Sequence, residues 1–166
     1  MKNLFYLFLI LFALGACGTK QEPKTIYVVR HAEKMLDGKD PMLSVAGTAR
    51  AKKLDQILAE KEIKHAFSTN TVRTLATIQP IANRSGIAKE IYDPEYHEDL
   101  AQELRKRKGN IIVVGHSNTI HHLINHFVGT GQKYDELKEE EYDYIFEITL
   151  AEDGSSSVER KVYKEY

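Results

Sequence analysis

The 166-residue chain has no tryptophan, only four prolines and a single cysteine. One cysteine cannot form a disulfide bond within the chain, so a disulfide framework does not hold this fold together. Neither sign of charge is in excess, since 23 Lys and Arg residues stand against 24 Asp and Glu residues, for a formal net charge of -1. This balance excludes a generally basic surface, and we expect no nucleic-acid partner.

The composition that is present is typical of an ordinary globular domain. Hydrophobic residues make up 42% of the chain and charged residues 28%, which excludes both a disordered chain and a protein with several membrane spans. The length is that of one domain, large enough to bury a core. Seven histidines are many for a chain of this size, so their positions are informative about function.

The N-terminal residues have the pattern of an export signal. Lys2 precedes an apolar run over residues 4–14, which is too short to span a bilayer as a helix but matches the core of a signal peptide. The run ends in Leu-Gly-Ala-Cys17, which contains the only cysteine and resembles the lipobox of bacterial lipoproteins. The resemblance implies that the chain is cut before Cys17 and that its thiol carries a lipid.

These features predict three segments. Residues 1–16 form a lipoprotein signal peptide, residues 17–24 a polar, lipid-anchored tether, and residues 25–166 one folded domain. We therefore expect an exported bacterial lipoprotein whose domain lies in the periplasm or at the cell surface. Its contact with the membrane is expected through the lipid anchor only.

Short apolar runs alternate with helical patterns along the predicted domain. The continuous apolar runs at 25–29 and 111–114 are typical of strands buried on both faces. Weaker or alternating patterns predict strands at 65–68, 144–150 and 158–163, and apolar spacing predicts helices at 44–58, 71–84, 98–108 and 118–128. Pro80 is expected to kink the second helix or to mark a new first turn.

The order of these elements predicts an α/β fold. We expect a three-layer, doubly wound, mostly parallel sheet with helices on both faces. The turn residues Asp153-Gly154 predict that the last two strands form a C-terminal hairpin at the sheet edge. Because ligands bind such sheets at the carboxyl ends of the strands, functional side chains are expected there.

Both strongly apolar strands lead into a histidine. Residues 26–29 run into Arg30-His31, and residues 111–114 run into Gly115-His116. If the two strands are neighbours, about 4.8 Å apart, the two imidazoles converge on one small ligand. A single histidine at such a position is more often structural, but two at equivalent strand ends favour a binding site.

Two arginines indicate the charge of that ligand. Arg30 lies at the end of a buried strand, where a guanidinium needs an anionic partner, and its fixed donors suit a carboxylate or a phosphate. Arg73 lies at the start of a predicted helix, whose free N–H groups also attract an anion. Together with His31 and His116, these arginines favour a phosphate.

Three blocks of the sequence resemble the signature motifs of the histidine phosphatase superfamily, in its phosphoglycerate-mutase-like branch. They are Arg30-His31-Ala32-Glu33-Lys34, Arg73-Thr74 and Gly115-His116-Ser117-Asn118, in this order across nearly the whole predicted domain. The resemblance implies that His31 is the nucleophile and forms a phosphohistidine. It further implies that the phosphoryl oxygens are held by Arg30, Arg73 and His116, and that the substrate site is lined by Glu33, Ser117 and Asn118.

The reaction that the resemblance implies needs neither a metal nor another cofactor. Ala32 stands where the motif usually has glycine, and it is still small enough for a phosphate to approach. Mutases of the family carry long insertions for which this chain lacks room, so we expect hydrolysis of a small phosphorylated substrate. A mutase, and a noncatalytic lipoprotein that binds phosphate or a phosphopeptide, are the alternatives.

Two carboxylates are candidates for the general acid. Hydrolysis of a phosphomonoester requires protonation of the leaving alkoxide. We favour Asp93, which follows Ile91 at a plausible strand end, and after it Glu95. Some compact relatives lack a clear acid and act on phosphoramidates, whose leaving groups need less help, so this substrate class is a further candidate.

Two other polar groups have simpler interpretations. His121, His122 and His126 are interpreted as surface or packing histidines rather than a metal site, because no further ligand stands out near them. The charged residues 133–143 predict a solvated segment. Since this segment leads into a strand, it is also a candidate border of the site.

Overall fold

The computed structural model describes residues 21–165. The predicted signal peptide, Cys17 and the first part of the predicted tether lie outside these residues. The first strand begins at Lys24, one residue earlier than predicted. The Lys24 side chain is buried, and its ammonium group donates hydrogen bonds to the backbone carbonyls of Arg105 and Arg107, so this residue belongs to the folded domain. Within residues 21–165, no helix combines the length and the apolar character that crossing a membrane requires.

The predicted helices and strands occur in the predicted order, and one short strand that was not among them, Lys89–Ile91, lies between the second and the third of the helices. The strands are β1 (Lys24–Arg30), β2 (Ile63–Ser68), β3 (Lys89–Ile91), β4 (Asn110–Gly115), β5 (Tyr144–Leu150) and β6 (Ser156–Val162). The α-helices are α2 (Val45–Ile57), α3 (Val72–Ser85), α4 (His97–Lys106) and α5 (Ser117–Asn125), and short 3-10 helices span Ala59–Lys61 and Tyr163–Glu165. The predicted bounds differ from these by a few residues, as expected where helix ends fray.

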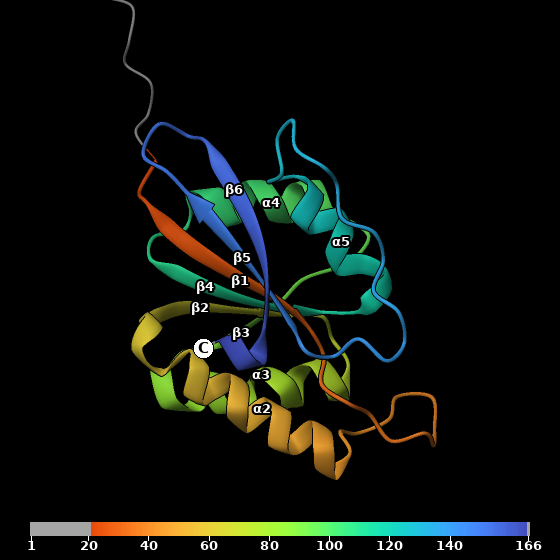
Figure 1. The fold of residues 1–166 in the computed structure, drawn as a ribbon. Helices are drawn as coiled ribbons and strands as arrows, with labels where there is room; N and C mark the ends of the chain where they lie inside the picture. The colour runs from red at the N-terminus through yellow and green to blue at the C-terminus, as the bar shows by residue number, and fades with distance from the viewer. Residues whose placement is uncertain (1–20, 166) are drawn as a thin grey trace, which may run out of the picture.

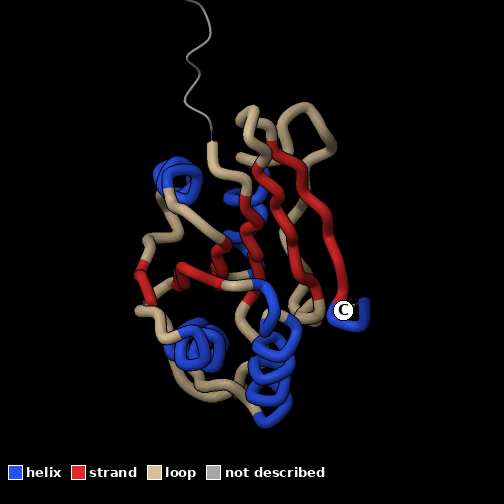
Figure 2. The backbone as a smooth tube through the Cα atoms, turned by 90° about the vertical axis from the view of Figure 1, so that its left-hand side faces the viewer, coloured by secondary structure: helices blue, strands red, loops and turns tan. Residues whose placement is uncertain are grey.

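The strands form one mixed sheet in the order β3-β2-β4-β1-β5-β6. Strands β3, β2, β4 and β1 are parallel, whereas β5 and β6 add to the β1 side in antiparallel pairs. Helices α2 and α3 cover one face of the sheet and α4 and α5 the other (Figure 1), and the turned view shows helices on both sides of the strands (Figure 2). The three-layer α/β fold with its C-terminal edge hairpin is therefore confirmed.

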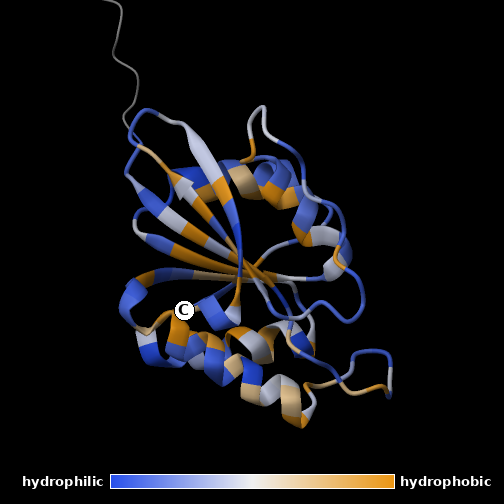
Figure 3. Cartoon of the chain, viewed as in Figure 1, coloured by the Kyte–Doolittle hydropathy of each residue, from blue (hydrophilic) through white to orange (hydrophobic). Residues whose placement is uncertain are grey.

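The central strands are apolar throughout because they bury side chains on both faces. In β1, Ile26 and Val28 pack toward α4 and α5, whereas Tyr27 and Val29 pack toward α2 and α3. The hydrophobic colour in Figure 3 follows these strands and the helix sides that face them. This two-sided core fixes the positions of the strand ends, where the polar residues begin.

Helix α3 differs from the expectation at its proline. Val72–Ser85 is one helix with Pro80 inside it, so this proline does not mark a new first turn. The Thr71 side chain caps the N-terminus by accepting a hydrogen bond from a backbone N–H of the first turn. Ile78 and Ile81, on either side of the proline, are fully buried, and this burial offsets the hydrogen bond that proline cannot donate.

A loop over residues 31–44 connects β1 to α2. Its two sides are joined by backbone hydrogen bonds, one of which runs from Ser44 N to Glu33 O over 2.9 Å. Gly47 lies in the first turn of α2, where a Cβ atom would come within 2.0 Å of the Glu33 carbonyl oxygen. Only glycine therefore lets α2 lie so close to the base of this loop.

Candidate active site

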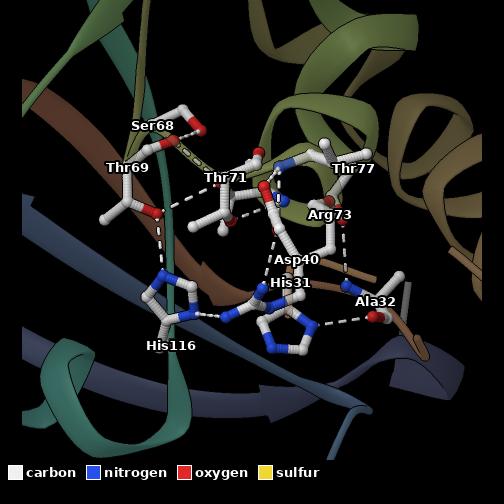
Figure 4. A network of polar contacts seen from close by, with 11 residues as sticks. His31, Ala32, Asp40, Ser68, Thr69, Thr71, Arg73, Thr77 and His116 are labelled. Carbon is white, nitrogen blue, oxygen red and sulfur yellow. Dashed lines mark hydrogen bonds and ion pairs between the residues drawn. The ribbon is translucent and has the colours of Figure 1, made fainter. Parts of the chain in front are cut away.

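The two histidines at the strand ends lie side by side. Strands β1 and β4 are neighbours, in a register that pairs Arg30 with Gly115. The backbone N–H of His31 donates to the Gly115 carbonyl over 2.8 Å, and the ring centroids of His31 and His116 are 5.4 Å apart. The predicted convergence of the two imidazoles at one sheet edge is what the structure shows (Figure 4).

The His31 ring is held in one neutral form. Its Nδ1 lies 2.8 Å from the carbonyl oxygen of Ala32, which can only accept a hydrogen bond, so Nδ1 carries the hydrogen and Nε2 keeps its lone pair. Burial lowers the pKa of His31 to about 4, and the charges of Arg30 and Arg73 act in the same direction. An unprotonated ring nitrogen is the form that can act as a nucleophile.

His116 uses both ring nitrogens within the protein. Its Nδ1 accepts a hydrogen bond from Arg73 over 3.3 Å, so the hydrogen lies on Nε2, which donates to Thr69 Oγ1 over 3.0 Å. Burial and, to a lesser extent, the positive charges of Arg73 and Arg30 lower the pKa of His116 to about 4. This ring is therefore fixed in orientation on both sides.

Arg30 is anchored by the segment before β5. Its NH1 group donates to the backbone carbonyls of Lys138 and Glu139 over 2.8 and 2.9 Å. Its NH2 group donates to the Glu139 carboxylate over 2.8 Å and to the Tyr142 hydroxyl over 3.2 Å, and its guanidinium lies 4.0 Å from the centre of the Tyr142 ring. The expectation that residues 133–143 border the site therefore agrees with the structure.

Arg73 comes from the first turn of α3 and faces the two histidines (Figure 4). Its NH1 group donates to the Asp40 carboxylate over 3.0 Å, and its NH2 group donates to His116. The Nε–H groups of both Arg73 and Arg30 are buried and have no hydrogen-bond partner among residues 21–165. Buried donors of this kind are suited to the oxygens of a bound anion.

Glu33 was predicted to line the substrate site, and the structure gives its carboxylate another partner. Arg50 of α2 donates from Nε to both carboxylate oxygens over 2.9 Å and from NH2 to one of them over 2.6 Å. Burial alone would raise the pKa of Glu33, but the hydrogen bonds from Arg50 outweigh it and the pKa is lowered. Glu33 therefore ties the residues after His31 to α2.

The remaining predicted binding residues begin helix α5. Ser117 and Asn118 directly follow His116 and form the first turn of this helix. Ser117 is partly buried, and its backbone carbonyl accepts a hydrogen bond from Leu137 over 3.4 Å, whereas Asn118 is exposed. Their position beside His116 is compatible with contact to a substrate.

The two candidates for the general acid lie in the turn after the edge strand β3. Asp93 and Glu95 follow β3, the edge strand, which is separated from β1 by β2 and β4. Both side chains are exposed, and the Asp93 carboxylate accepts the backbone N–H of Glu95 over 2.9 Å. In the arrangement of residues 21–165, no hydrogen bond or ion pair joins either carboxylate to His31 or His116.

Four of the other five histidines gather between α4 and α5, whereas His65 lies in β2. The ring of His97 lies 5.1 Å from that of His122, and the rings of His121 and His122 are 3.9 Å apart. His122 and His126 are exposed. Among residues 21–165, no three side chains of the metal-binding types are arranged to hold an ion.

Four residues of the site were not predicted from the sequence: Asp40, Thr69, Glu139 and Tyr142. Thr69 directly follows β2, so the rule that ligands bind at the carboxyl ends of strands gave a signal for it. Glu139 and Tyr142 lie in the charged segment that was expected to border the site. Asp40 lies in a loop without periodicity, and we find no sequence signal that points to it.

Two neutral histidines and two arginines lie at the carboxyl edge of this doubly wound sheet. Such a site in an α/β protein is suited to bind a phosphate-like oxyanion. Residues 26–101 match the family model of the histidine phosphatase superfamily (branch 1). This span contains Arg30, His31 and Arg73 in the predicted motif positions. The match spans 76 of the 166 residues, and the motifs of the sequence point to the same superfamily. No curated protein sequence matches the chain.

Solved structures show the same fold. The protein histidine phosphatase SixA complexed with tungstate has a TM-score of 0.68 at 13% identity, and the match covers 85% of this chain and 98% of that one. A phosphoglycerate mutase from Bacillus anthracis str. Sterne has a TM-score of 0.68 at 17% identity, with coverage of 86% and 94%. A mycobacterial glucosyl-3-phosphoglycerate phosphatase has a TM-score of 0.61 at 10% identity, with coverage of 85% and 98%.

Proposed function

We propose that this chain is a metal-independent phosphatase that acts through a phosphohistidine on His31. The observation that carries the proposal is the state of the His31 ring. Its Nδ1–H is used by its own backbone, its Nε2 lone pair is free of a proton near neutral pH, and two guanidinium groups flank it.

In the first step, Nε2 of His31 attacks the phosphorus of the substrate. The bond between phosphorus and the leaving oxygen or nitrogen breaks, and its electron pair goes to the leaving atom, which takes up a proton from solvent. Negative charge on the phosphoryl oxygens is offset by the Nε–H groups of Arg30 and Arg73. Because these donors are already ordered, little reorganisation is needed in the transition state.

In the second step, water attacks the phosphohistidine. The P–N bond breaks, its electron pair returns to Nε2 of His31, and inorganic phosphate leaves. The water proton goes to solvent or to the departing phosphate. The neutral imidazole is thereby restored, because the low pKa of His31 disfavours its protonation.

The position of the acidic residues favours substrates whose leaving group needs little protonation. Asp93 and Glu95 lie after the edge strand, and the Asp93 carboxylate already accepts a backbone N–H. We therefore propose phosphoramidates such as phosphohistidine, together with aryl phosphates, as better substrates than alkyl phosphates. The fold of the protein histidine phosphatase SixA is consistent with this class.

Mutase activity is the second candidate function, because a phosphoglycerate mutase is among the structures with the same fold. We expected the short chain to lack room for mutase chemistry. The fold of the Bacillus anthracis phosphoglycerate mutase is nevertheless covered over 94% of its length by this chain, so size alone does not separate the two reactions. The fate of the phosphoryl group does.

Labelling of the mature domain with a radioactive phosphate donor tests the proposal. We expect acid-labile, alkali-stable label on His31, followed by release of free phosphate, and no loss of rate with a chelator. A His31→Ala variant should carry no label, whereas a His126→Ala variant, which changes an exposed histidine at the end of α5, should label normally.

Other results of this labelling experiment would indicate a different function or contradict the mechanism. Binding of phosphate without covalent label indicates the noncatalytic binder, and label that moves to a second sugar position with little free phosphate indicates a mutase. Label on a residue other than His31, or loss of activity with the chelator, contradicts the proposed mechanism.

We also propose that the protein is anchored to a membrane through a lipid on Cys17. The polar residues that precede β1 support this proposal, since they suit a tether between a lipid and the domain. A Cys17→Ser variant should then move from the membrane fraction to the soluble fraction. Unchanged fractionation of this variant contradicts the anchor.

A further inference from the structure

The two arginines of the site are held to different degrees. Arg30 is 3% exposed and is fixed by two backbone carbonyls, a carboxylate and a phenol ring. The terminal nitrogens of Arg73 contact only Asp40 and His116 among residues 21–165, and its side chain is 18% exposed. The placement of the Arg73 guanidinium therefore depends on few contacts, and one of them is ionic.

Asp40 reaches this guanidinium from the loop between β1 and α2. One of its carboxylate oxygens lies 3.0 Å from NH1 of Arg73, and its two oxygens accept the backbone N–H of Val72 over 3.0 and 3.2 Å (Figure 4). A single side chain thus binds both the first turn of α3 and the arginine that this turn carries. The charged hydrogen bond restricts a side chain that is otherwise rich in rotamers.

We propose that Asp40 is a positioning residue that holds Arg73 in the orientation needed to bind a phosphoryl group. With NH1 held by Asp40 and NH2 by His116, the Nε–H of Arg73 is left for an oxygen of the ligand. The inference rests on the proposed function, since it takes this site to be the one that binds the phosphoryl group.

The effect of Asp40 extends to the second histidine. Arg73 donates to Nδ1 of His116, and this contact places the hydrogen of that ring on Nε2. A displaced Arg73 would therefore also release the orientation of His116. Asp40 thus affects both Arg73 and His116, although it lies in the loop between β1 and α2.

Two roles for Asp40 predict opposite results in anion binding. If its carboxylate only adds negative charge near the site, its removal should tighten the binding of an anion. If it positions Arg73, its removal should weaken that binding because a donor is lost. Tungstate is a suitable probe, since it is a phosphate-like oxyanion and its affinity can be measured without turnover.

The experiment compares the affinity for tungstate of the wild-type domain and an Asp40→Asn variant by calorimetry. The asparagine oxygen can still accept the Val72 N–H, so the contact with α3 is kept while the ion pair is lost. We expect the affinity to fall about tenfold, which corresponds to about 1.4 kcal/mol. An Asp37→Asn variant in the same loop, where the side chain is exposed, is the matched control and should bind as the wild type does.

An Arg73→Lys background separates positioning from a structural cap. If Asp40 acts through Arg73, the Asp40→Asn change should alter tungstate affinity less than about twofold there, because lysine has no guanidinium group for Asp40 to orient. A second variant, Asp40→Glu, keeps the charge and should lie between the wild type and Asp40→Asn. Circular dichroism of each variant checks that the fold is kept.

The outcomes distinguish this inference from the proposed function. Unchanged or tighter tungstate binding by Asp40→Asn overturns the positioning role, and so does an equal loss in the Arg73→Lys background. A wild-type domain that binds tungstate but shows no turnover overturns the proposed catalysis only, and the affinities still decide the role of Asp40. A wild-type domain without affinity for tungstate overturns both.

Discussion

His31 and His116 end neighbouring parallel strands, yet the protein treats the two rings differently. His31 donates Nδ1–H to the backbone carbonyl of Ala32 and keeps its Nε2 lone pair. His116 gives Nδ1 to Arg73 and Nε2–H to Thr69. Both have a pKa of about 4, so the difference is one of hydrogen bonding rather than of charge.

Under the proposed function, this difference favours His31 as the nucleophile and His116 as the residue that orients Arg73. A nucleophile needs an uncommitted lone pair, which only His31 has among the two. A residue that orients a neighbouring arginine needs fixed hydrogen bonds, which His116 has on both nitrogens. Equivalent places in the fold thus serve different purposes because the residues around them differ.

The largest expected effect is that of removing the nucleophile. His31→Ala should reduce turnover to the background rate, because no other group can form the covalent intermediate. The measurement is release of phosphate from an aryl phosphate, with tungstate affinity as the check that the site is still formed. A variant that keeps more than about a hundredth of wild-type activity would contradict the role of His31, since loss of a nucleophile costs far more than this.

Substitution of the second histidine should cost less. His116→Gln removes a ring that is bonded to both Arg73 and Thr69, and we expect a fall in kcat of about a hundredfold, as for the loss of one stabilising donor. Phosphohistidine should still form on His31, only more slowly, which rapid-quench labelling would show. Absence of any label in this variant would mean that the two rings share the role of nucleophile.

The sequence was informative where the core determines the structure. The continuous apolar runs of β1 and β4 lead into His31 and His116, and the sequence predicted that the two rings converge if these buried strands are neighbours. The hydrogen bonds that distinguish the rings come from Thr69, Arg73 and the local backbone, and these required coordinates. Asp40 is the extreme case, because it is brought to Arg73 by a loop whose path has no periodic signal.

The pH dependence of activity tests whether both rings are neutral. Because the pKa of each is lowered to about 4, kcat/KM should not show an acid limb near the usual histidine value of about 6.5. It should fall about tenfold per pH unit only below pH 4, after correction for ionisation of the substrate. An apparent pKa of about 6.5 on this limb would show that the nucleophile is protonated near neutral pH.

The lowered pKa values of His31 and His116 also affect the stability of the fold. In the unfolded chain these histidines take up protons as the pH falls through about 6.5, whereas in the folded state they resist protonation until about pH 4. The free energy of unfolding should therefore decrease between these values, by up to roughly 3 kcal/mol for each histidine. In urea titrations, the difference in the free energy of unfolding between the wild type and His31→Ala should change with pH in this window and stay constant above it.

A smaller effect is expected from the partner of His116. Thr69→Val keeps the side-chain volume but removes the acceptor for Nε2–H, at a cost of about 1 kcal/mol, or roughly a fivefold fall in kcat. Thr149→Val, on the exposed side of β5, makes the same chemical change away from the site and should have no effect on kcat. Equal rates for Thr69→Val and the wild type would show that His116 does not depend on this bond.

The smallest effects are expected at the two carboxylates after β3. Because Asp93 and Glu95 lie outside the cluster of histidines and arginines, Asp93→Asn and Glu95→Gln should each change kcat by less than about threefold with a phosphoramidate or an aryl phosphate. The comparison becomes sharper with an alkyl phosphate, whose leaving group depends most on an acid. If either variant lost its activity on the alkyl substrate alone, the turn after β3 would have to move toward His31 during the reaction, and that residue would be the general acid.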